Sequence, residues 1–354
     1  MSDVHSQVQD YYGKQLKTSA DLKTDACKTT TSYTTDIKKI IGQIHDEVVS
    51  KYYGCGLTIP DALAGLKVLD LGSGSGRDCY ILSKLVGQQG SVIGVDMTDE
   101  QLAVANRHVD YHTEKFGYEK PNVQFLKGNI DHLENLNIAD QSLDLIVSNC
   151  VINLAENKQG ILNQAFRMLK EGGEMYFSDV YASRRVPANL QKDPVLLGEC
   201  LGGALYWNDF LDMAKKAGFN DPRMVEGRVL GIENADIEAK TQGITFYSIT
   251  YRLMKISNLE HACEDYGQAV KYNGTITDMG SPNVFTLDDH HVFEAGRIYP
   301  VCGNSYRMLN ETRYREHFTF YGDFETHFGL FEGCGQEPAM AEASSDSSEA
   351  ASCC

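Results

Sequence analysis

The sequence predicts an α/β protein whose main body is a doubly wound sheet, and three observations lead to this prediction. Short apolar runs alternate with amphipathic segments from Leu66 onward. A glycine-rich stretch directly follows the first of these runs, and an acidic residue, Asp96, ends the second. Strands, turns and helices in this repeated order are typical of parallel sheets with helices on both faces.

The N-terminal part predicts helices that precede the sheet. Residues 4–17 and 32–50 carry apolar side chains at roughly helical spacing. We therefore expect an N-terminal helical cap over residues 1–56, which covers one side of the sheet.

Residues 57–181 predict the five strands of the sheet domain and the helices between them. The strands are expected at residues 66–71, 91–97, 122–130, 142–150 and 173–180. A first helix should begin near Asp78, and one long helix should follow Thr98, which stands with Gln101 in the spacing of a capping box. A third helix over 159–170 is expected to end at the two glycines that follow it.

The regular alternation ends after residue 181, which indicates an inserted substrate-binding segment. We assign this segment and the final strands to residues 182–258, with a helix around 208–217 and a β-branched, aromatic strand at 244–256 that completes the sheet. Residues 259–335 predict a small C-terminal module, and the acidic tail 336–354 has the composition of a disordered segment.

Composition and charge exclude several classes of protein. Hydrophobic residues make up 42% of the chain and charged residues 23%, as in soluble globular proteins. The formal net charge of −17 argues against nucleic acid and anionic membranes as partners, because both select basic patches. No apolar run approaches the length of a membrane span, and the start of the chain lacks the features of a secretory signal. We therefore expect a cytoplasmic protein.

The glycine-rich stretch at 70–76 predicts a nucleoside site. Glycines between a strand and a helix let the backbone approach a ligand, and an acidic residue at the end of the second strand, Asp96, can accept both hydroxyls of a ribose. A nicotinamide fingerprint would need a third glycine where Arg77 stands. The spacing resembles instead the first motif of class I methyltransferases.

That motif gives a set of expected cofactor contacts. Asn129 and Ile130 fall where class I methyltransferases contact adenine. The methyl donor of these enzymes carries a sulfonium cation, and Tyr52 or Tyr53 could contact it with an aromatic face. The alternative is that this pair only packs the N-terminal helix. The expected contacts are Asp70, Gly72, Ser73, Gly74, Gly76, Asp96, Met97, Asn129, Ile130 and Ser148.

Ten cysteines are many for a chain that we expect in a reducing cytosol. Four stand in unusual local contexts: Cys27, Cys55, Cys150 and Cys200. None of them has the C-x-x-C spacing of a zinc ribbon or a thioredoxin motif. If they meet in space, they offer soft thiolates without imidazole, which suits a thiophilic centre. Cys150 follows the fourth strand and should therefore lie at the cofactor edge of the sheet.

Other candidate residues receive structural interpretations. We expect Cys79, in the first helix of the sheet domain, to be a small buried hydrophobic residue. His290 and His291 read as part of a polar turn, because no further ligands for a metal stand at sensible spacing. We assign no role to Cys302, Cys334, Cys353 and Cys354.

Several longer stretches closely resemble eukaryotic arsenite methyltransferases. They are the four cysteine contexts together with DLGSGSGRD, GECLGGALYW, VCGNSYRML and HFTFYGDFETHFGLFEGC, and the resemblance runs over residues 1–335. It implies a class I methyltransferase fold, S-adenosylmethionine as cofactor, arsenite and methylarsenite as substrates, and thioredoxin or glutathione as reductant. It also implies that Cys150, Cys200 and Cys55 hold trivalent arsenic and that Cys27 and Cys55 take part in a disulfide relay. We expect a monomer.

Three other functions remain open from the residues alone. The first is an enzyme of the same fold that methylates a small organic acceptor, and the second is a non-catalytic protein that binds arsenite. The third is a nicotinamide oxidoreductase, which Arg77 disfavours. The first should be insensitive to replacement of the cysteines, a methylated arsenic product would exclude the second, and a thermal shift with each cofactor would separate the third.

Overall fold

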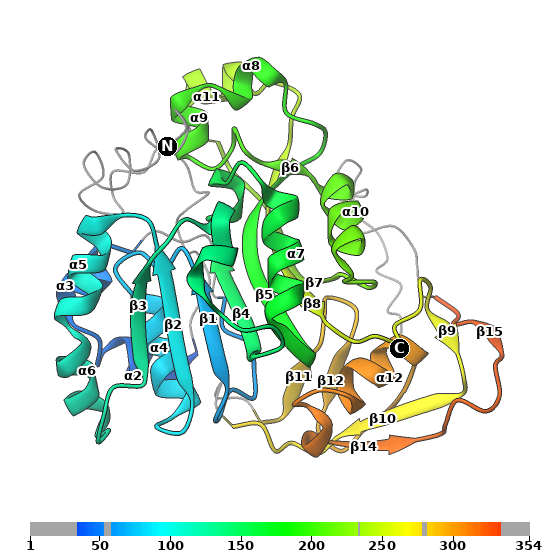
Figure 1. The fold of residues 1–354 in the computed structure, drawn as a ribbon. Helices are drawn as coiled ribbons and strands as arrows, with labels where there is room; N and C mark the ends of the chain where they lie inside the picture. The colour runs from blue at the N-terminus through cyan, green and yellow to red at the C-terminus, as the bar shows by residue number, and fades with distance from the viewer. Residues whose placement is uncertain (1–33, 53–57, 233, 278–281, 334–354) are drawn as a thin grey trace. The chain divides into compact units, whose positions relative to one another are not determined.

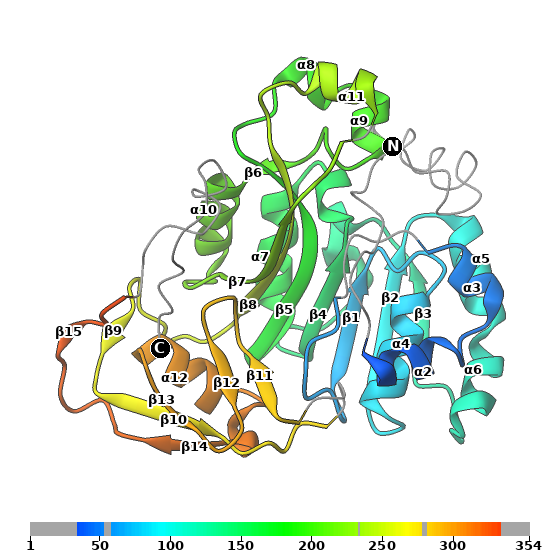
Figure 2. The same ribbon diagram turned by 180° about the vertical axis from the view of Figure 1, so that it is seen from behind.

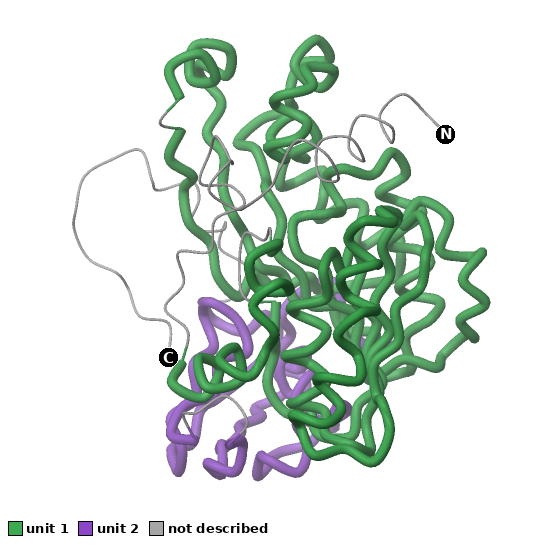
Figure 3. Tube along the Cα trace, turned by 90° about the vertical axis from the view of Figure 1, so that its left-hand side faces the viewer, with its two compact units in different colours: residues 1–255, 278–280 green, residues 256–277, 281–354 purple. Residues whose placement is uncertain are grey.

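The computed structural model describes residues 34–52, 58–232, 234–277 and 282–333. The chain divides into two compact units, unit 1 with residues 1–255 and 278–280 and unit 2 with residues 256–277 and 281–354 (Figure 3). The helix expected at 4–17 and the tail 336–354 lie outside the described residues, as do Cys27, Cys55, Cys334, Cys353 and Cys354. In the described part, no helix is both long and apolar enough to cross a membrane.

Unit 1 is built on an eight-stranded sheet with the order β3-β2-β1-β4-β5-β8-β7, and β6 pairs with β5 (Figure 1). The strands are β1 (Lys67–Leu71), β2 (Ser91–Asp96), β3 (Val123–Lys127), β4 (Leu143–Asn149), β5 (Leu169–Ala182), β6 (Leu205–Tyr206), β7 (Arg223–Val229) and β8 (Phe246–Met254). Strands β1 to β6 pair in parallel, whereas β8 is antiparallel to both β5 and β7. The doubly wound sheet predicted from the sequence is confirmed.

Helices cover both faces of this sheet. α4 and α5 pack beside β1 to β3 on one face, which Figure 2 shows in front, and α7 and α10 pack together on the other face, in front in Figure 1. Three short helices, α8, α9 and α11, gather at one end of the sheet. The helices of unit 1 are α2 (Thr35–Ile41), α3 (Asp46–Ser50), α4 (Arg77–Val86), α5 (Asp99–Arg107), α6 (Val109–Phe116), η3 (Ile130–Leu136), η4 (Ile152–Leu154), α7 (Lys158–Met168), α8 (Ala188–Gln191), α9 (Pro194–Gly198), α10 (Trp207–Ala217) and α11 (Ala235–Lys240).

The strand order places a ligand site between β1 and β4. The chain runs outward from β1 to β3 and then returns to form β4 on the other side of β1. Helices therefore leave β1 and β4 toward opposite faces, and a crevice opens at the carboxyl ends of these two strands.

The edge of the sheet differs from the prediction. The predicted strand at 244–256 forms β8, but all nine of its residues are buried, because β8 lies inside the sheet between β5 and β7. β7, which the sequence analysis missed, forms the edge. Of its residues RMVEGRV, one is buried, three are half-buried and three are exposed, and the sequence is too polar to predict a strand.

Two helix predictions in the sheet domain are wrong. The single long helix expected after Thr98 is divided into α5 and α6 at His108, whose backbone leaves the helical range with φ −106° and ψ 11°. α7 ends at Met168, before the glycines, and β5 begins at once with Leu169. Gly172 has a φ of 75° inside β5, where the pairing with β4 shifts register, so that glycine serves the strand.

Unit 2 combines small sheets with one helix. β10 (Gln268–Tyr272) pairs with β13 (Ile298–Val301) and β14 (Phe318–Tyr321), β11 (Val284–Thr286) pairs with β12 (Val292–Glu294), and β9 (Glu264–Asp265) pairs with β15 (Gly329–Leu330). Its helices are α12 (Gly303–Asn310) and η5 (Arg315–His317). Its core is aromatic, with Tyr272, Phe285, Phe293, Tyr314 and Phe318 in edge-to-face and tilted contacts.

The two histidines of unit 2 lie in a hydrogen-bonded turn. Asp288 Oδ1 accepts hydrogen bonds from the backbone amides of His290 and His291, at 3.0 and 2.8 Å, and lies 2.7 Å from His291 Nδ1. A buried aspartate that caps its own turn in this way accounts for both histidines, as the sequence analysis expected.

Candidate functional site

A cavity of about 980 Å³, with the open solvent at its mouth included, lies at the carboxyl ends of β1, β2 and β4 in unit 1. Its lining comes from the glycine-rich turn, the ends of β2, β3 and β4, and the segment that follows α3. The lining residues are Lys51, Tyr52, Asp70, Gly72, Ser73, Gly74, Ser75, Asp78, Asp96, Met97, Thr98, Gln101, Gly128, Asn129, Ile130, Asp131, Asn149, Cys150, Val151, Leu154 and Ala155.

The glycine-rich turn presents its backbone to this cavity. Gly74 has a φ of 52°, and a Cβ added there would meet no atom within 4 Å. Its amide donates to Asp96 Oδ2 at 2.9 Å, and the amide of Thr98 donates to Asp96 Oδ1 at 2.8 Å. Asp96 thus joins the turn to the start of α5, and burial raises the pKa of its carboxyl group.

Two buried polar atoms in the cavity lining have no hydrogen-bond partner among the described residues. They are Ser73 Oγ and Gln101 Oε1. Buried polar groups are almost always hydrogen-bonded in folded proteins, so these two atoms indicate a polar ligand in the cavity.

Gln101 lines the cavity although it was not among the predicted site residues. Its spacing predicts a capping box with Thr98, but the Thr98 amide donates to Asp96 and the Thr98 side chain makes no cap. Gln101 is therefore free to face the cavity. Gln101 stands one turn into the helix that follows Asp96, and this position could have indicated a cavity contact from the sequence.

The N-terminal helical segment closes one wall of the cavity. The Tyr52 hydroxyl accepts from Asn149 Nδ2 at 2.6 Å, and the Arg77 guanidinium lies 3.3 Å from the centre of the Tyr52 ring. Ser75 Oγ donates to the carbonyl of Val48 in α3 at 2.9 Å. One face of Tyr52 is thus already stacked on a cation, and Tyr53 lies outside the described residues.

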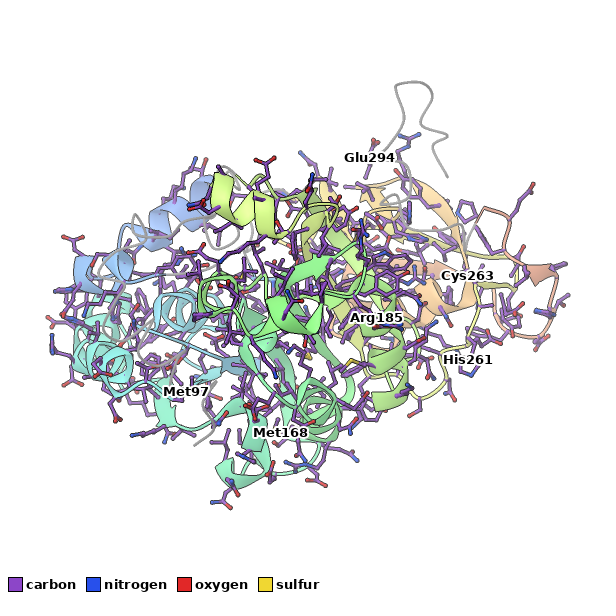
Figure 4. The ribbon with its side chains drawn as sticks, turned by 90° about the horizontal axis from the view of Figure 1, so that it is seen from above. Met97, Met168, Arg185, His261, Cys263 and Glu294 are labelled. Atoms are coloured by element: carbon purple, nitrogen blue, oxygen red, sulfur yellow. The ribbon has the colours of Figure 1, made fainter. Side chains whose placement is uncertain are left out.

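The structure places the expected cofactor contacts in two groups. Asp70, Gly72, Ser73, Gly74, Asp96, Met97, Asn129 and Ile130 line the cavity, and Figure 4 marks Met97 beyond the end of β2. Gly76 and Ser148 do not line it. Gly76 begins α4 with a φ of 89°, where a Cβ would lie 2.6 Å from Phe125 Cζ. Ser148 donates to the carbonyl of Leu71 at 3.3 Å and so links β4 to β1.

Asp70 and Asn129 already have partners of their own. Cys79 Sγ donates to Asp70 Oδ2 at 3.1 Å, which accounts for that buried cysteine of α4. Burial, together with the nearby charge of Asp78, raises the pKa of Asp70 to about 7. Asn129 Oδ1 accepts from the Asp131 amide at 2.9 Å and caps η3.

Cys150 and Cys200, which are 50 positions apart in the sequence, lie together beside the cavity. The Cys200 thiol donates to the carbonyl oxygen of Cys150 at 3.5 Å, and Cys150 lines the cavity. Both have left-handed backbones, with φ of 56° and 62°, which few residues other than glycine adopt. The two belong to one buried apolar cluster with Leu154, Val180 and Leu197. Such a site excludes water from the sulfurs.

The oxidation states of the described cysteines differ. Cys150 is disulfide-bonded, whereas Cys79, Cys200, Cys263 and Cys302 are in the reduced thiol form. The sulfur of Cys150 is therefore not a free thiolate in this structure. Cys27 and Cys55, the other two expected members of the thiol site, lie outside the described residues.

The fold and the cavity define an S-adenosylmethionine-dependent methyltransferase of class I. A family model described as a methyltransferase domain matches residues 63–218, which carry the glycine-rich turn, Asp96 and the cysteine-bearing segments. A second model, described as the arsenite methyltransferase C-terminal domain, matches residues 266–354.

The chain belongs to the arsenite methyltransferase family. It is 57% identical to the arsenite methyltransferase of Aquipseudomonas alcaligenes over 94% of this chain and 95% of that protein. It is 45% identical to the arsenite methyltransferase of Rattus norvegicus over 90% of this chain and 85% of that protein. A crystal structure of an arsenic(III) S-adenosylmethionine methyltransferase from Chlamydomonas reinhardtii matches with a TM-score of 0.81 and 46% identity, over 85% of this chain and all of that chain.

Proposed function

We propose that Cys150 and Cys200 hold trivalent arsenic at the edge of the cofactor cavity, where it receives methyl groups from S-adenosylmethionine. The observation that carries this proposal is the 3.5 Å contact between the Cys200 thiol and the Cys150 carbonyl at the cavity wall. This chain is an arsenite methyltransferase by family, and the arrangement of the two cysteines supports a specific place for its substrate.

The cavity residues fit a nucleoside cofactor. The unpaired oxygens of Ser73 and Gln101 and the carboxyl group of Asp96 in the cavity lining offer donors and acceptors to the polar parts of such a cofactor. Ile130 and Met97, which also line the cavity, offer apolar surface for a base. When bound, S-adenosylmethionine supplies an electrophilic methyl group on a sulfonium sulfur.

Soft thiolates are suitable ligands for trivalent arsenic, and no imidazole or general base is needed. Arsenic bound by thiolates keeps a lone pair, which forms the new arsenic–carbon bond while the electrons of the broken sulfur–carbon bond stay on the cofactor sulfur. The task of Cys150 and Cys200 is then to hold arsenic in line with the methyl carbon, at roughly 3 to 3.5 Å. Their buried apolar surroundings keep water out of this geometry.

Each methyl transfer raises arsenic from the trivalent to the pentavalent state, so a return to trivalent arsenic needs two electrons. We propose that a dithiol of this chain supplies them by forming a disulfide and that a thiol reductant of the thioredoxin or glutathione kind reduces it again. The disulfide state of Cys150 supports this part of the proposal. Cys27 and Cys55 stay predicted members of the relay.

Arsenic speciation by mass spectrometry tests the proposal. The full-length enzyme is incubated with S-adenosylmethionine, arsenite and a thiol reductant, and the methylated arsenicals are quantified. We expect Cys150→Ser and Cys200→Ser each to reduce product formation by at least about a hundredfold, because one sulfur cannot keep arsenic in line with the methyl group. Cofactor affinity, measured by calorimetry, should change little.

Cys79→Ser is the matched control, because Cys79 is a buried thiol of the same unit that contacts Asp70 and not the paired cysteines. It should retain methylation. If Cys150→Ser and Cys200→Ser still produced methylated arsenic at the wild-type rate, the substrate would be held elsewhere.

A further inference from the structure

Gly203 lies where the two cysteine-bearing segments touch. It follows Cys200 by three positions, and its neighbour across the contact is Asn153 in η4, the turn that follows Cys150. A Cβ added at Gly203 would overlap the Asn153 carbonyl oxygen and lie 2.9 Å from the carbonyl carbon. Carbon atoms that are not bonded pack at about 3.5 to 4.0 Å. Only glycine fits this contact, and both partners are backbone.

The Asn153 side of the contact is fixed. The amide of Asn153 donates to Asp179 Oδ2 at 3.0 Å, and its side-chain amide donates to the carbonyl of Val180 at 2.5 Å. Both partners belong to β5, which is buried in the middle of the sheet. The turn after Cys150 therefore cannot retreat from Gly203 without breaking its bonds to β5.

The Gly203 side is fixed as well. The amide of Gly202 donates to the carbonyl of Leu196 in α9 at 2.8 Å. Directly after Ala204 the chain enters β6, which pairs with the end of β5 (Figure 1). The loop is thus held between α9 and β6, and an added methyl group has to push the two segments apart.

We propose that Gly203 is a positioning residue that sets the separation of the Cys150 and Cys200 sulfurs. This inference rests on the proposed function, in which one arsenic atom bridges the two sulfurs. The close backbone contact at Gly203 joins the turn after Cys150 to the loop after Cys200, and it therefore fixes how far apart the backbones of these two left-handed residues lie. A displacement on the order of 1 Å at this contact is enough to spoil a two-sulfur site.

Gly203→Ala tests the inference in the full-length, reduced enzyme. We expect arsenite affinity, measured by calorimetry, to fall by about a hundredfold, while S-adenosylmethionine affinity stays within about twofold of wild type. Gly227→Ala is the matched control, because a Cβ at Gly227 in β7 first meets the flexible end of Met224, at 3.3 Å. It should retain both affinities.

A bridging reagent distinguishes a change of separation from a general loss of structure. In reduced Gly203→Ala, a bismaleimide with a long flexible linker should still join Cys150 to Cys200, as peptide mass spectrometry would detect. Arsenite should no longer protect the pair from that reagent. Loss of both cross-linking and arsenite protection would mean that the substitution disorders the site, and the positioning role would be rejected.

Asp179→Asn tests the same contact from the side of Asn153. If Gly203→Ala does not fold, this variant tests the positioning role instead. The two carboxylate oxygens of Asp179 accept from the backbone amides of Asn153 and Val180. Asparagine has nearly the same volume but only one such oxygen, so one of the two amides loses its acceptor. A selective loss of arsenite affinity, smaller than that of Gly203→Ala, supports the inference. Wild-type arsenite affinity in every folded variant overturns it, whereas wild-type affinity in Cys150→Ser and Cys200→Ser would overturn the proposed function itself.

Discussion

Two carboxyl groups in unit 1, those of Asp70 and Asp179, are buried where an ionised carboxylate is unfavourable. Asp70 lines the cofactor cavity at the end of β1, and Asp179 binds the turn after Cys150 from within β5. Burial raises the pKa of Asp70 to about 7 and the pKa of Asp179 to about 6, from an ordinary value of 3.8. The hydrogen bonds that Asp179 accepts from backbone amides oppose this rise without cancelling it.

These raised pKa values predict how stability depends on pH. Between about pH 4 and pH 7 the folded protein keeps a proton on Asp70 that the unfolded chain has lost, so unfolding releases protons. The free energy of unfolding should therefore fall as pH rises through this range, by at most about 1.4 kcal/mol per pH unit for one such group.

Asp70→Asn should remove the share of this slope that belongs to Asp70. Asparagine keeps an acceptor for the Cys79 thiol but has no proton to lose. Denaturant unfolding of the cofactor-free protein at pH 5, 6 and 7 measures the slope, which should be flatter in the variant. Equal slopes in the two proteins would show that Asp70 ionises normally.

Among the elements, the antiparallel pair of β5 and β8 holds a salt bridge that is almost wholly buried. Arg252 Nε donates to Glu174 Oε1 at 2.7 Å, and their side chains are 1% and 0% exposed. The guanidinium also lies 5.4 Å from the centre of the Tyr176 ring. Glu174 stands in β5, the strand that also carries Asp179 and pairs with β6, and Arg252 stands in the neighbouring strand β8.

Removing one partner of this pair should be costly. Arg252→Met removes the guanidinium that faces the buried carboxyl group of Glu174, and we expect a loss of about 3 to 5 kcal/mol in the free energy of unfolding. The double variant Arg252→Met with Glu174→Leu should recover most of that loss, because it leaves no buried charge. Denaturant unfolding of both variants measures the difference, and a single variant as stable as wild type would refute the argument.

The elements also show how far sequence reasoning reaches. Strands β1 to β4 were predictable because each is a short apolar run that ends in a turn or polar signal, as Asp96 ends β2. β7 was not, since an edge strand gains its partners from tertiary structure and its own residues are polar. The break between α5 and α6 at His108 has no proline or glycine to mark it.

The site was predictable to a different degree. The glycine-rich turn and Asp96 follow from the order of strands, and Cys150 follows from its place after β4. The nearness of Cys200 could be inferred only from resemblance, because its loop is set by α9, β6 and the contact at Gly203. Gln101 was missed because a local helix signal offered a simpler role than a cavity contact.

On the scale of the whole molecule, unit 1 carries both halves of the proposed chemistry. The cavity and both cysteines of the proposed arsenic site belong to unit 1, so the proposed methyl donor and arsenic acceptor lie within one compact unit. Unit 2 folds around its own aromatic core, and its sequence matches the C-terminal domain model of the family. The account therefore depends on sulfur atoms of unit 1 acting as arsenic ligands.

Arsenic K-edge X-ray absorption of the reduced, arsenite-loaded enzyme measures those ligands directly. We predict at least two sulfur neighbours around arsenic in the wild-type protein, at least one fewer in Cys150→Ser and in Cys200→Ser, and no change in Cys79→Ser. An arsenic shell that is identical in all four proteins, or that contains oxygen alone in the wild type, would contradict the account.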